Sequence, residues 1–227
     1  MDKHRKVPNR KLSPESFLEE FSHKHNNINT IPAQLTTSQL SDAMKNVTGR
    51  NGVLNGIKPV KNEMNILGSA TTVKTSSKDW GTVIEGIYIA EEGNILVISC
   101  DADDTAVWGE MASNAAQKRG IDGTVIYGAC RDVAGIKKLD YPVFSRDIIP
   151  NAGKPLNEGE INIPVTCGGT TVHPGDLIMG DECGVVCVPA EFIEKVIEES
   201  NKILDTENQI LDYLKNGKSF TEILGMK

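Results

Sequence analysis

Apolar residues gather in short runs in the first half of the chain, and glycine or polar residues separate the runs. Residues 66–74 and 94–100 are typical of strands, and the second run is continuously apolar, as a strand covered on both faces must be. Residues 108–119 follow a helical pattern, and residues 123–128 form another apolar run. A strand, a helix and a strand in this order predict a βαβ unit with two parallel strands.

The rest of the pattern predicts shorter strands and two flanking helices. Residues 36–44 start a capped helix, and residues 190–216 have the pattern of one long helix that Gly217 closes. Residues 174–176, Pro-Gly-Asp, are the clearest turn. The further strands are expected at residues 56–60, 141–145, 160–166 and 181–189. Strands that alternate with helices indicate an α/β fold.

The first 30 residues differ from the rest. Residues 1–12 are basic, and Ser13 and Pro14 begin a short amphipathic helix that a polar linker follows. No apolar region follows the basic residues, which argues against a signal peptide. We therefore predict a basic N-terminal extension over residues 1–30 and a main domain over residues 31–227. The extension is either a solvated tail or a segment that binds an acidic partner.

Composition places the chain among soluble globular proteins. Of its 227 residues, 39% are hydrophobic and only 5% are aromatic, so the core should be aliphatic. The longest apolar runs are far below the roughly 18 residues that a membrane-spanning helix needs, and no membrane association is expected. The net charge of −7 repels phosphate backbones, so no nucleic-acid partner is expected either.

Cysteine and histidine usage indicates a reduced, cytoplasmic protein without a zinc site. No CxxC pair occurs among Cys100, Cys130, Cys167, Cys183 and Cys187. The last two share one face of the strand expected at 181–189, where core thiols are commoner than zinc ligands. Three of the four histidines lie in the first 30 residues, and His173 adjoins a turn, where a surface residue is the simpler interpretation than a catalyst.

No sequence motif of a nicotinamide, P-loop, hydrolase or zincin site is present. Candidate chemistry instead follows the first strand of the βαβ unit. After Cys100 the chain leads into a helix N-terminus at Gly109, where free N–H groups form an anion site and glycine permits close approach. The alternative is ordinary capping of this helix by Asp103, Asp104 or Thr105.

The second strand of the unit ends at Arg131 and Asp132. Ligands of parallel α/β sheets bind beyond the carboxyl ends of the strands. There an arginine can bind a carboxylate with two hydrogen bonds, and an aspartate is a hard ligand for a divalent cation. The alternative is a surface ion pair or a turn-capping aspartate. Two such features on successive strand ends favour a binding site.

An ordered series of motifs resembles the RraA-like family. The family includes the class II 4-hydroxy-4-methyl-2-oxoglutarate/4-carboxy-4-hydroxy-2-oxoadipate aldolases and the regulators of ribonuclease E activity. The resemblance covers residues 35–217 and excludes the first 30 residues. The motifs that carry it are WGEMA at 108–112, RGIDGTVIYGACRD at 119–132, YPVF at 141–144, PGD at 174–176 and DECGVVCVP at 181–189.

The resemblance implies a three-layer, swivelling-domain-like (phosphohistidine-domain-like) α/β/α fold with a long C-terminal helix. It also implies a homotrimer or homohexamer whose active site lies between subunits. In that site, Asp132 would ligate Mg²⁺ or Mn²⁺. The residues that would bind the substrate are Gly109, Glu110, Met111, Ala112 and Arg131. The chain departs from the family in two places, since Glu110 replaces a common aspartate and Tyr127 a common acidic residue.

In the aldolases, a glutamate on the C-terminal helix reaches the neighbouring subunit's site, and Glu207 matches it. Ile203, Ile210 and Leu214 share its helical face by their spacing. A carboxylate on an apolar stripe is costly to bury without a partner, which favours a site between subunits. The alternative is that the helix end frays or rotates enough to expose Glu207.

The function that the resemblance implies is a divalent-metal-dependent lyase. It would cleave a 4-hydroxy-2-oxo dicarboxylic acid by a retro-aldol reaction to pyruvate and a second oxo-acid, with oxaloacetate decarboxylation as a side activity. Arg131, Glu110 and Glu207 would be the catalytic residues. The alternatives are a non-catalytic regulator that binds a ribonuclease and a related sugar- or organic-acid enzyme. A Schiff-base aldolase is disfavoured because Lys137 and Lys138 are expected in a polar loop.

Overall fold

The computed structural model of the protein describes residues 31–32 and 34–226. The chain divides into Met1–Pro32 and Ala33–Lys227, and every element below belongs to the second unit. The amphipathic helix expected near Ser13 lies outside the described residues. None of the helices in the described part is long and apolar enough to cross a membrane.

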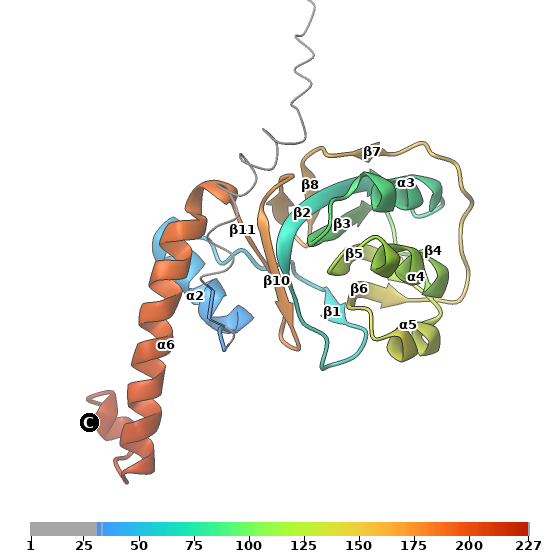
Figure 1. Ribbon diagram of the computed structural model, residues 1–227. Helices are drawn as coiled ribbons and strands as arrows, with labels where there is room; N and C mark the ends of the chain where they lie inside the picture. The colour runs from blue at the N-terminus through green and yellow to red at the C-terminus, as the bar shows by residue number, and fades with distance from the viewer. Residues whose placement is uncertain (1–30, 33, 227) are drawn as a thin grey trace, which may run out of the picture. The chain divides into compact units, whose positions relative to one another are not determined.

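A mixed β-sheet forms the centre of the fold (Figure 1). Four strands run parallel in the order β6-β5-β3-β2, and antiparallel strands extend both ends, which confirms the α/β prediction and the parallel pairing within the βαβ unit. The parallel strands are β2 (Ile66–Thr75), β3 (Asn94–Cys100), β5 (Gly123–Cys130) and β6 (Val143–Ile148). The antiparallel strands of the two ends are β1 (Lys58–Pro59), β10 (Leu177–Asp181) and β11 (Gly184–Val188).

The sheet curls until its two ends nearly meet. The chain that leads into β1 bonds to β11 at the far end, since Leu54 N–H donates to Val185 O and Cys187 N–H donates to Gly52 O, both at 2.9 Å. The shorter strands are β4 (Ala106–Trp108), which is parallel to β5, β7 (Glu160–Ile161), which is antiparallel to β2, and a separate hairpin of β8 (Val165–Cys167) and β9 (Thr170–Val172). Near closure hides most edge N–H and C=O groups from solvent.

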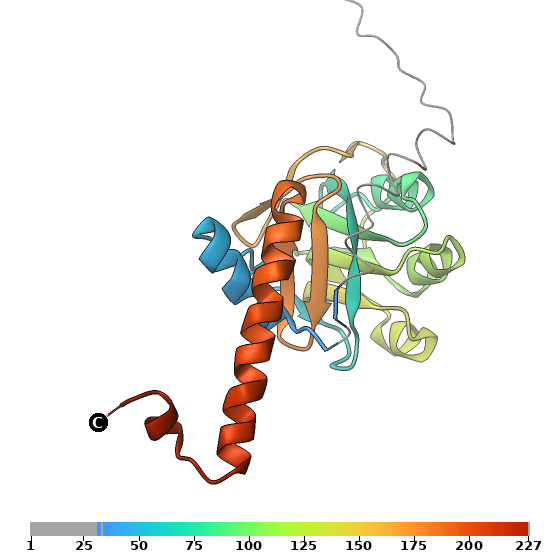
Figure 2. The same cartoon turned by 60° about the vertical axis from the view of Figure 1, so that its left-hand side comes forward.

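Two groups of helices lie on different sides of the sheet (Figures 1 and 2). The first group, which lies on one side, is α3 (Gly81–Ile89), α4 (Glu110–Lys118) and α5 (Val133–Leu139). The second group is α2 (Thr37–Thr48) and α6 (Ile193–Lys215), which pack together beside β11, and α7 (Phe220–Ile223) follows. Thr36 and Gln39 form a reciprocal capping box at the start of α2, which confirms the helix expected there.

Three of the predicted elements are divided or begin differently in the structure. Residues 181–189 are not one strand, because the chain turns between β10 and β11, where Gly184 has a φ of +137°. Cys183 therefore lies exposed in the turn, and it does not share a strand face with the buried Cys187. The predicted strand over 160–166 divides into β7 and β8, and the C-terminal helix begins with a 3₁₀ turn, Ala190–Phe192.

The prediction of a loop at Lys137 and Lys138 is also wrong. Both lysines lie in α5 and are exposed, while Ile136 anchors this short helix in the core. A single buried residue gives too weak a periodicity to recognise a two-turn helix from sequence. All five cysteines are free, and four of them are buried, as reduced thiols were expected to be.

A buried carboxylate, Asp79, joins the start of α3 to a distant irregular segment, residues 151–158. The side chain is fully buried, and both of its oxygens accept hydrogen bonds. Its donors, at 2.6–3.1 Å, are the N–H groups of Gly81, Leu156, Asn157 and Glu158 and the hydroxyl groups of Thr75 and Thr82. Burial acts to raise the pKa of Asp79, but the hydrogen bonds from Thr82 and from residues 156–158 outweigh burial and hold the pKa well below its usual value.

We expect Asp79 to make the fold sensitive to acid. A carboxylate whose pKa is lowered by folding contributes fully to stability above its unfolded pKa, about 3.9 for Asp, and loses that contribution as the pH falls further. Urea denaturation followed by circular dichroism should therefore show Asp79→Asn to be less stable than the wild type near neutral pH. The difference should shrink as the pH is lowered below about 4, and a difference independent of pH would contradict the assignment.

Candidate functional site

A crevice of about 400 Å³ opens at the carboxyl ends of β4 and β5. This is the edge at which ligands of parallel sheets bind, so the location matches the prediction. One wall comes from the start of α4 and the end of β5, and consists of Gly109, Met111, Ala112, Arg131 and Asp132. The opposite wall comes from α3 and the segment 151–158, and includes Trp80, Ile84, Ala152 and Gly153.

The start of α4 contributes backbone donors to this crevice. Gly109 is the N-cap residue, and no side chain caps the helix in the described part of the chain. The first N–H groups of a helix have no partner within it, and they favour anions. The capping alternative is wrong, because Asp103 pairs with Arg146 at 3.2 Å and Asp104 accepts a bond from Ser77 at 2.6 Å.

Gly109 brings the two predicted features together. A Cβ atom at this position would lie 2.6 Å from Asp132 Oδ2 and 3.3 Å from Arg131 Cγ. Glycine therefore lets the Arg131 and Asp132 side chains lie directly against the helix N-terminus. The helix N-terminus and the Arg131–Asp132 pair, which the sequence predicts as two separate features at successive strand ends, therefore lie together in one candidate site.

Arg131 and Asp132 form a loose pair at the end of β5. Arg131 Nε lies 3.5 Å from Asp132 Oδ2, and 37% and 42% of the two side chains are exposed. Asp132 has a φ of 57°, a left-handed conformation that Asp tolerates better than most residues. Its carbonyl oxygen, not its side chain, accepts the N–H groups of Gly135 and Ile136 at the start of α5. The carboxylate is thus not used as a cap and stays available to a ligand.

Trp108 attaches α4 to the sheet. Its buried indole N–H donates to Ser113 Oγ at 2.8 Å, and Ser113 Oγ donates in turn to Gly109 O at 3.0 Å. The ring stacks on Tyr141 with a centroid distance of 6.3 Å. The sequence pattern predicts Trp108 within the helix, whereas it lies in β4, and the pattern does not indicate its role in holding the start of α4. Its spacing of five residues from Ser113 carries no periodicity signal.

The remaining predicted residues take different places. Met111 is 79% exposed and Ala112 is buried, and both line the crevice. Glu110 is exposed at the start of α4, and its carboxylate lies against Gly135. Tyr127 does not line the crevice, and Arg146 lies over its ring at 5.0 Å.

Glu207 is not part of the crevice within one chain. It is exposed on α6, and its Oε2 accepts a hydrogen bond from Gln39 Nε2 at 2.5 Å. Helix α6 lies on the other side of the sheet from α4 (Figures 1 and 2). The single chain exposes this carboxylate, although α6 does not fray and continues to Lys215. Its role in a neighbouring subunit stays a prediction.

The donor set suits a cation that keeps part of its water shell. Among the described residues, no group of three or more His, Cys, Asp or Glu side chains could enclose a metal ion. Mg²⁺ is commonly held by one or two carboxylates, with waters and substrate oxygens completing an octahedron. The half-exposed Asp132 carboxylate on an open crevice fits this kind of site.

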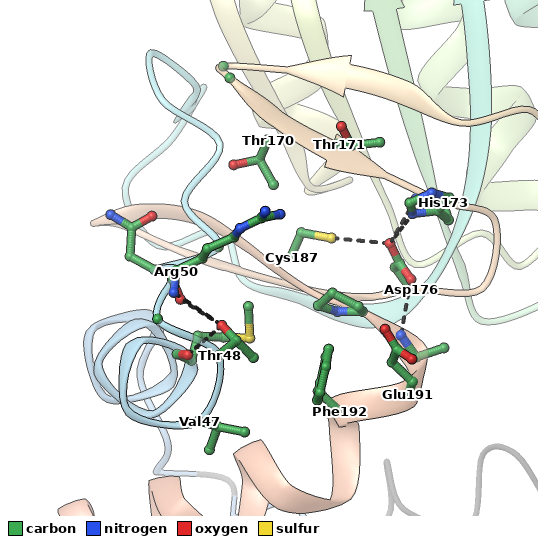
Figure 3. Close-up of a pocket in the computed structure, with 18 of the residues that line it drawn as sticks. Val47, Thr48, Arg50, Thr170, Thr171, His173, Asp176, Cys187, Glu191 and Phe192 are labelled. Atoms are coloured by element: carbon green, nitrogen blue, oxygen red, sulfur yellow. Dashed lines mark hydrogen bonds and ion pairs between the residues drawn. The ribbon is translucent and has the colours of Figure 1, made fainter.

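A larger cavity of about 1190 Å³ lies elsewhere, between the end of α2, the β8–β9 hairpin and the start of α6 (Figure 3). It shares no lining residue with the crevice. Its buried carboxylate, Asp176, accepts the N–H groups of His173 at 2.7 Å and Ala190 at 3.1 Å. Burial raises the pKa of Cys187 well above its usual value, and the neighbouring Asp176 adds to this, so the thiol is protonated. The crevice, with its helix N-terminus, Arg131 and Asp132, is therefore the better candidate site.

The fold and the crevice define an α/β protein with a candidate binding site at the carboxyl edge of its parallel strands, beside an uncapped helix N-terminus. The chain belongs to the RraA-like family, whose description is Aldolase/RraA, and residues 37–187 match it.

Relatives and solved structures agree with this family. An uncharacterized protein of Methanocaldococcus jannaschii is 44% identical over 77% of this chain and 85% of its own length. A protein of Halalkalibacterium halodurans, provisionally named a 4-hydroxy-4-methyl-2-oxoglutarate aldolase, is 36% identical over 76% of this chain and 80% of its own length.

Among solved structures, an uncharacterized protein of Pseudomonas syringae pathovar tomato superimposes with a TM-score of 0.75 at 27% identity, over 88% of this chain and 96% of that one. The RNA-processing inhibitor RraA from Thermus thermophilis has a TM-score of 0.59 at 19% identity, over 66% of this chain and 92% of that one, and it shows the fold alone.

We expect Ser113→Ala to destabilise the protein, because it leaves the buried Trp108 N–H without an acceptor. The free energy of unfolding should fall by about 1–3 kcal/mol, as measured by urea denaturation. Asn114→Ala is the matched control, since the neighbouring Asn114 is exposed and bonds only to the carbonyl of Glu110. Equal stability of the two variants would show that the Trp108–Ser113 bond does not hold α4.

Proposed function

We propose that the protein is a carbon–carbon lyase. It cleaves a 4-hydroxy-2-oxo dicarboxylic acid by a retro-aldol reaction to pyruvate and a second oxo-acid. The observation that carries this proposal is the contact of Arg131 and Asp132 with the uncapped N-terminus of α4 at Gly109. The aldolase name of the Halalkalibacterium halodurans relative supports the reaction class. Oxaloacetate decarboxylation passes through the same enolate and would be a side activity.

The chain's own residues account for binding and charge stabilisation. The N–H groups of residues 110–112 would bind the substrate's carboxylate at the positive end of the helix. The Arg131 guanidinium would donate to the 2-oxo oxygen, where negative charge grows as the C3–C4 bond breaks. Its neighbour Asp132 keeps the guanidinium oriented across 3.5 Å.

Asp132 would hold Mg²⁺ or Mn²⁺, which when bound supplies Lewis-acid polarisation of the 2-oxo group. Glu110 and the Glu207 of another subunit would orient the water that removes the proton of the 4-hydroxyl group. The same water would return the proton to C3 of the enolate, which gives pyruvate. Protons and electrons then balance without any further reactant.

The surface of the C-terminal region supports self-association, which in the proposed assembly would give a homotrimer or homohexamer. The last turns of α6 and the residues after them expose large apolar side chains, which a chain leaves uncovered at a cost. These side chains are Leu211, Tyr213, Leu214, Phe220, Leu224 and Met226. Packing of this region on another copy would bury them and would bring Glu207 to a neighbour's crevice.

The alternative function is a non-catalytic regulator that binds a ribonuclease. A docking surface has no need of a carboxylate and a guanidinium set against a helix N-terminus inside a crevice. The arrangement therefore favours the lyase. Pyruvate release from a panel of 4-hydroxy-2-oxo acids and oxaloacetate, with and without Mg²⁺ or Mn²⁺, tests the choice directly.

We expect activity to depend on a divalent cation at Asp132. Asp132→Asn should lower pyruvate release by about 100-fold or more, because cation polarisation contributes several kcal/mol to such reactions. Chelation should have the same effect, and added Mg²⁺ should reverse it. Asp140→Asn is the matched control, because Asp140 is also exposed, has the same φ of 57°, and ends the helix that Asp132 begins. Full turnover of Asp132→Asn would disprove the role of Asp132.

We expect the active site to be shared between subunits. Asp132→Asn and Glu207→Gln should each be inactive, and activity should partly return when the two variants are unfolded and refolded together. Mixed oligomers would contain interfaces with both residues intact, whereas sites within one chain could not be rescued. Mass measurement checks that mixed oligomers form. If they form and stay inactive, Glu207 has no role in a neighbour's site.

A further inference from the structure

The second wall of the crevice is built from segments that are far apart in the sequence. Trp80 and Ile84 come from the start of α3, whereas Ala152 and Gly153 come from the segment 151–158. This segment has little regular structure of its own, so its position depends on bonds to other elements. Asn151 O accepts the N–H group of Ala106 in β4 at 2.9 Å, which ties the near end of the segment to the sheet.

Beyond Gly153 the segment runs alongside the chain that enters α3. Lys154 N–H donates to Lys78 O at 2.7 Å, and Trp80 N–H donates to Lys154 O at 3.0 Å. The indole N–H of Trp80 donates to Gly153 O at 3.0 Å. A Cβ atom at Gly153 would overlap the backbone of Lys78, so this part of the wall has no spare space.

Asp79 holds the far end of the same segment. Its Oδ1 accepts the N–H groups of Leu156 at 2.9 Å and Asn157 at 3.1 Å, and its Oδ2 accepts that of Glu158 at 3.0 Å. The same carboxylate accepts Gly81 N–H at 2.8 Å at the start of α3. One buried anion thus fastens both components of the wall to each other.

The hydrogen bonds to the segment 151–158 depend on both oxygens of the Asp79 carboxylate being acceptors. Both oxygens are acceptors only, and each receives a backbone N–H group from the segment. An asparagine of the same shape would present an NH₂ group to one set of these donors, so a backbone N–H would lose its partner. Loss of one of the buried hydrogen bonds between residues 156–158 and Asp79 would weaken the attachment of the segment 151–158, which contains Gly153.

We propose that Asp79 is a positioning residue that sets the width of the crevice and thereby the affinity for substrate. It is fully buried and does not line the crevice, and it acts through Trp80 and Gly153, which do. The effect on catalysis rests on the proposed function, whereas the effect on the crevice wall does not. The opposite wall, with Arg131 and Asp132, stays in place.

Asp79→Asn tests the proposal by steady-state kinetics. Loss of contacts that hold the substrate equally in the ground and transition states raises KM and leaves kcat unchanged. We expect KM for the oxo-acid to rise about tenfold, with kcat changed less than about twofold. Thr71→Val is the matched control for a general loss of stability. It removes a buried bond of 2.7 Å to Asn94 at the opposite end of the strands, so its KM should equal that of the wild type.

Two readouts need no turnover. Hydrogen exchange of the backbone amides of residues 156–158 should be faster in Asp79→Asn and unchanged in Thr71→Val. The two tryptophans of the chain, Trp80 and Trp108, both line the crevice, so quenching of their emission by pyruvate with Mg²⁺ reports binding. We expect this quenching to need a higher pyruvate concentration in Asp79→Asn.

These results separate the two hypotheses. If no oxo-acid is cleaved but exchange still accelerates at residues 156–158, the proposed function fails and Asp79 still positions the wall. If exchange is unchanged, or if it accelerates while KM and the quenching stay at the wild-type values, the positioning role is disproved. Thr82→Ala is a milder second variant, since it removes only the 2.6 Å bond to Asp79 Oδ2 and the 2.9 Å bond from Gly159. It should shift exchange and KM in the same direction by a smaller factor.

Discussion

The short parallel pairing of β4 with the end of β5 is the constraint on which the crevice depends. Ala106 pairs with Ala129 and Trp108 with Cys130, and the N–H group of Arg131 donates to Trp108 O at 2.9 Å. The other side of β4 holds the segment 151–158 through Asn151. Both walls of the crevice are therefore attached to one three-residue strand, and Asp79 fixes the far end of the second wall.

Anion binding at the proposed site would have to be local, because the net charge of the chain is −7. The field of the whole protein would repel an anionic substrate at long range, and the attraction would come from one helix N-terminus and one arginine. Two other carboxylates, those of Asp79 and Asp176, are buried, and both accept hydrogen bonds from backbone N–H groups. The two buried carboxylates thus have hydrogen-bond donors within the fold, whereas the Asp132 carboxylate stays partly exposed.

The C-terminal half of α6 has a different physical character from the rest of the molecule. The first turns of the helix pack against α2 and bury Val196, Ile197 and Ser200, whereas nearly every residue after Leu204 is exposed. A helix with this composition is more stable when its apolar face is covered. This half of α6 is therefore the part of the chain that another subunit would cover in the proposed assembly.

The order of the elements and the residues at the strand ends follow from the amino-acid sequence alone. A continuously apolar run such as residues 94–100 is stable in a strand that is covered on both faces. The helical pattern between this run and the next one, residues 123–128, predicts that a helix connects two parallel strands. The sequence also places Arg131 and Asp132 at a carboxyl edge. That the two strand ends come together is visible only in the folded chain, because the contact between Gly109 and Asp132 joins residues with no periodic relation. The same holds for Asp79, whose partners at residues 156–158 are nearly 80 positions away. Local patterns report which face of an element is buried, and they contain no information on which distant backbone N–H groups a buried carboxylate will meet.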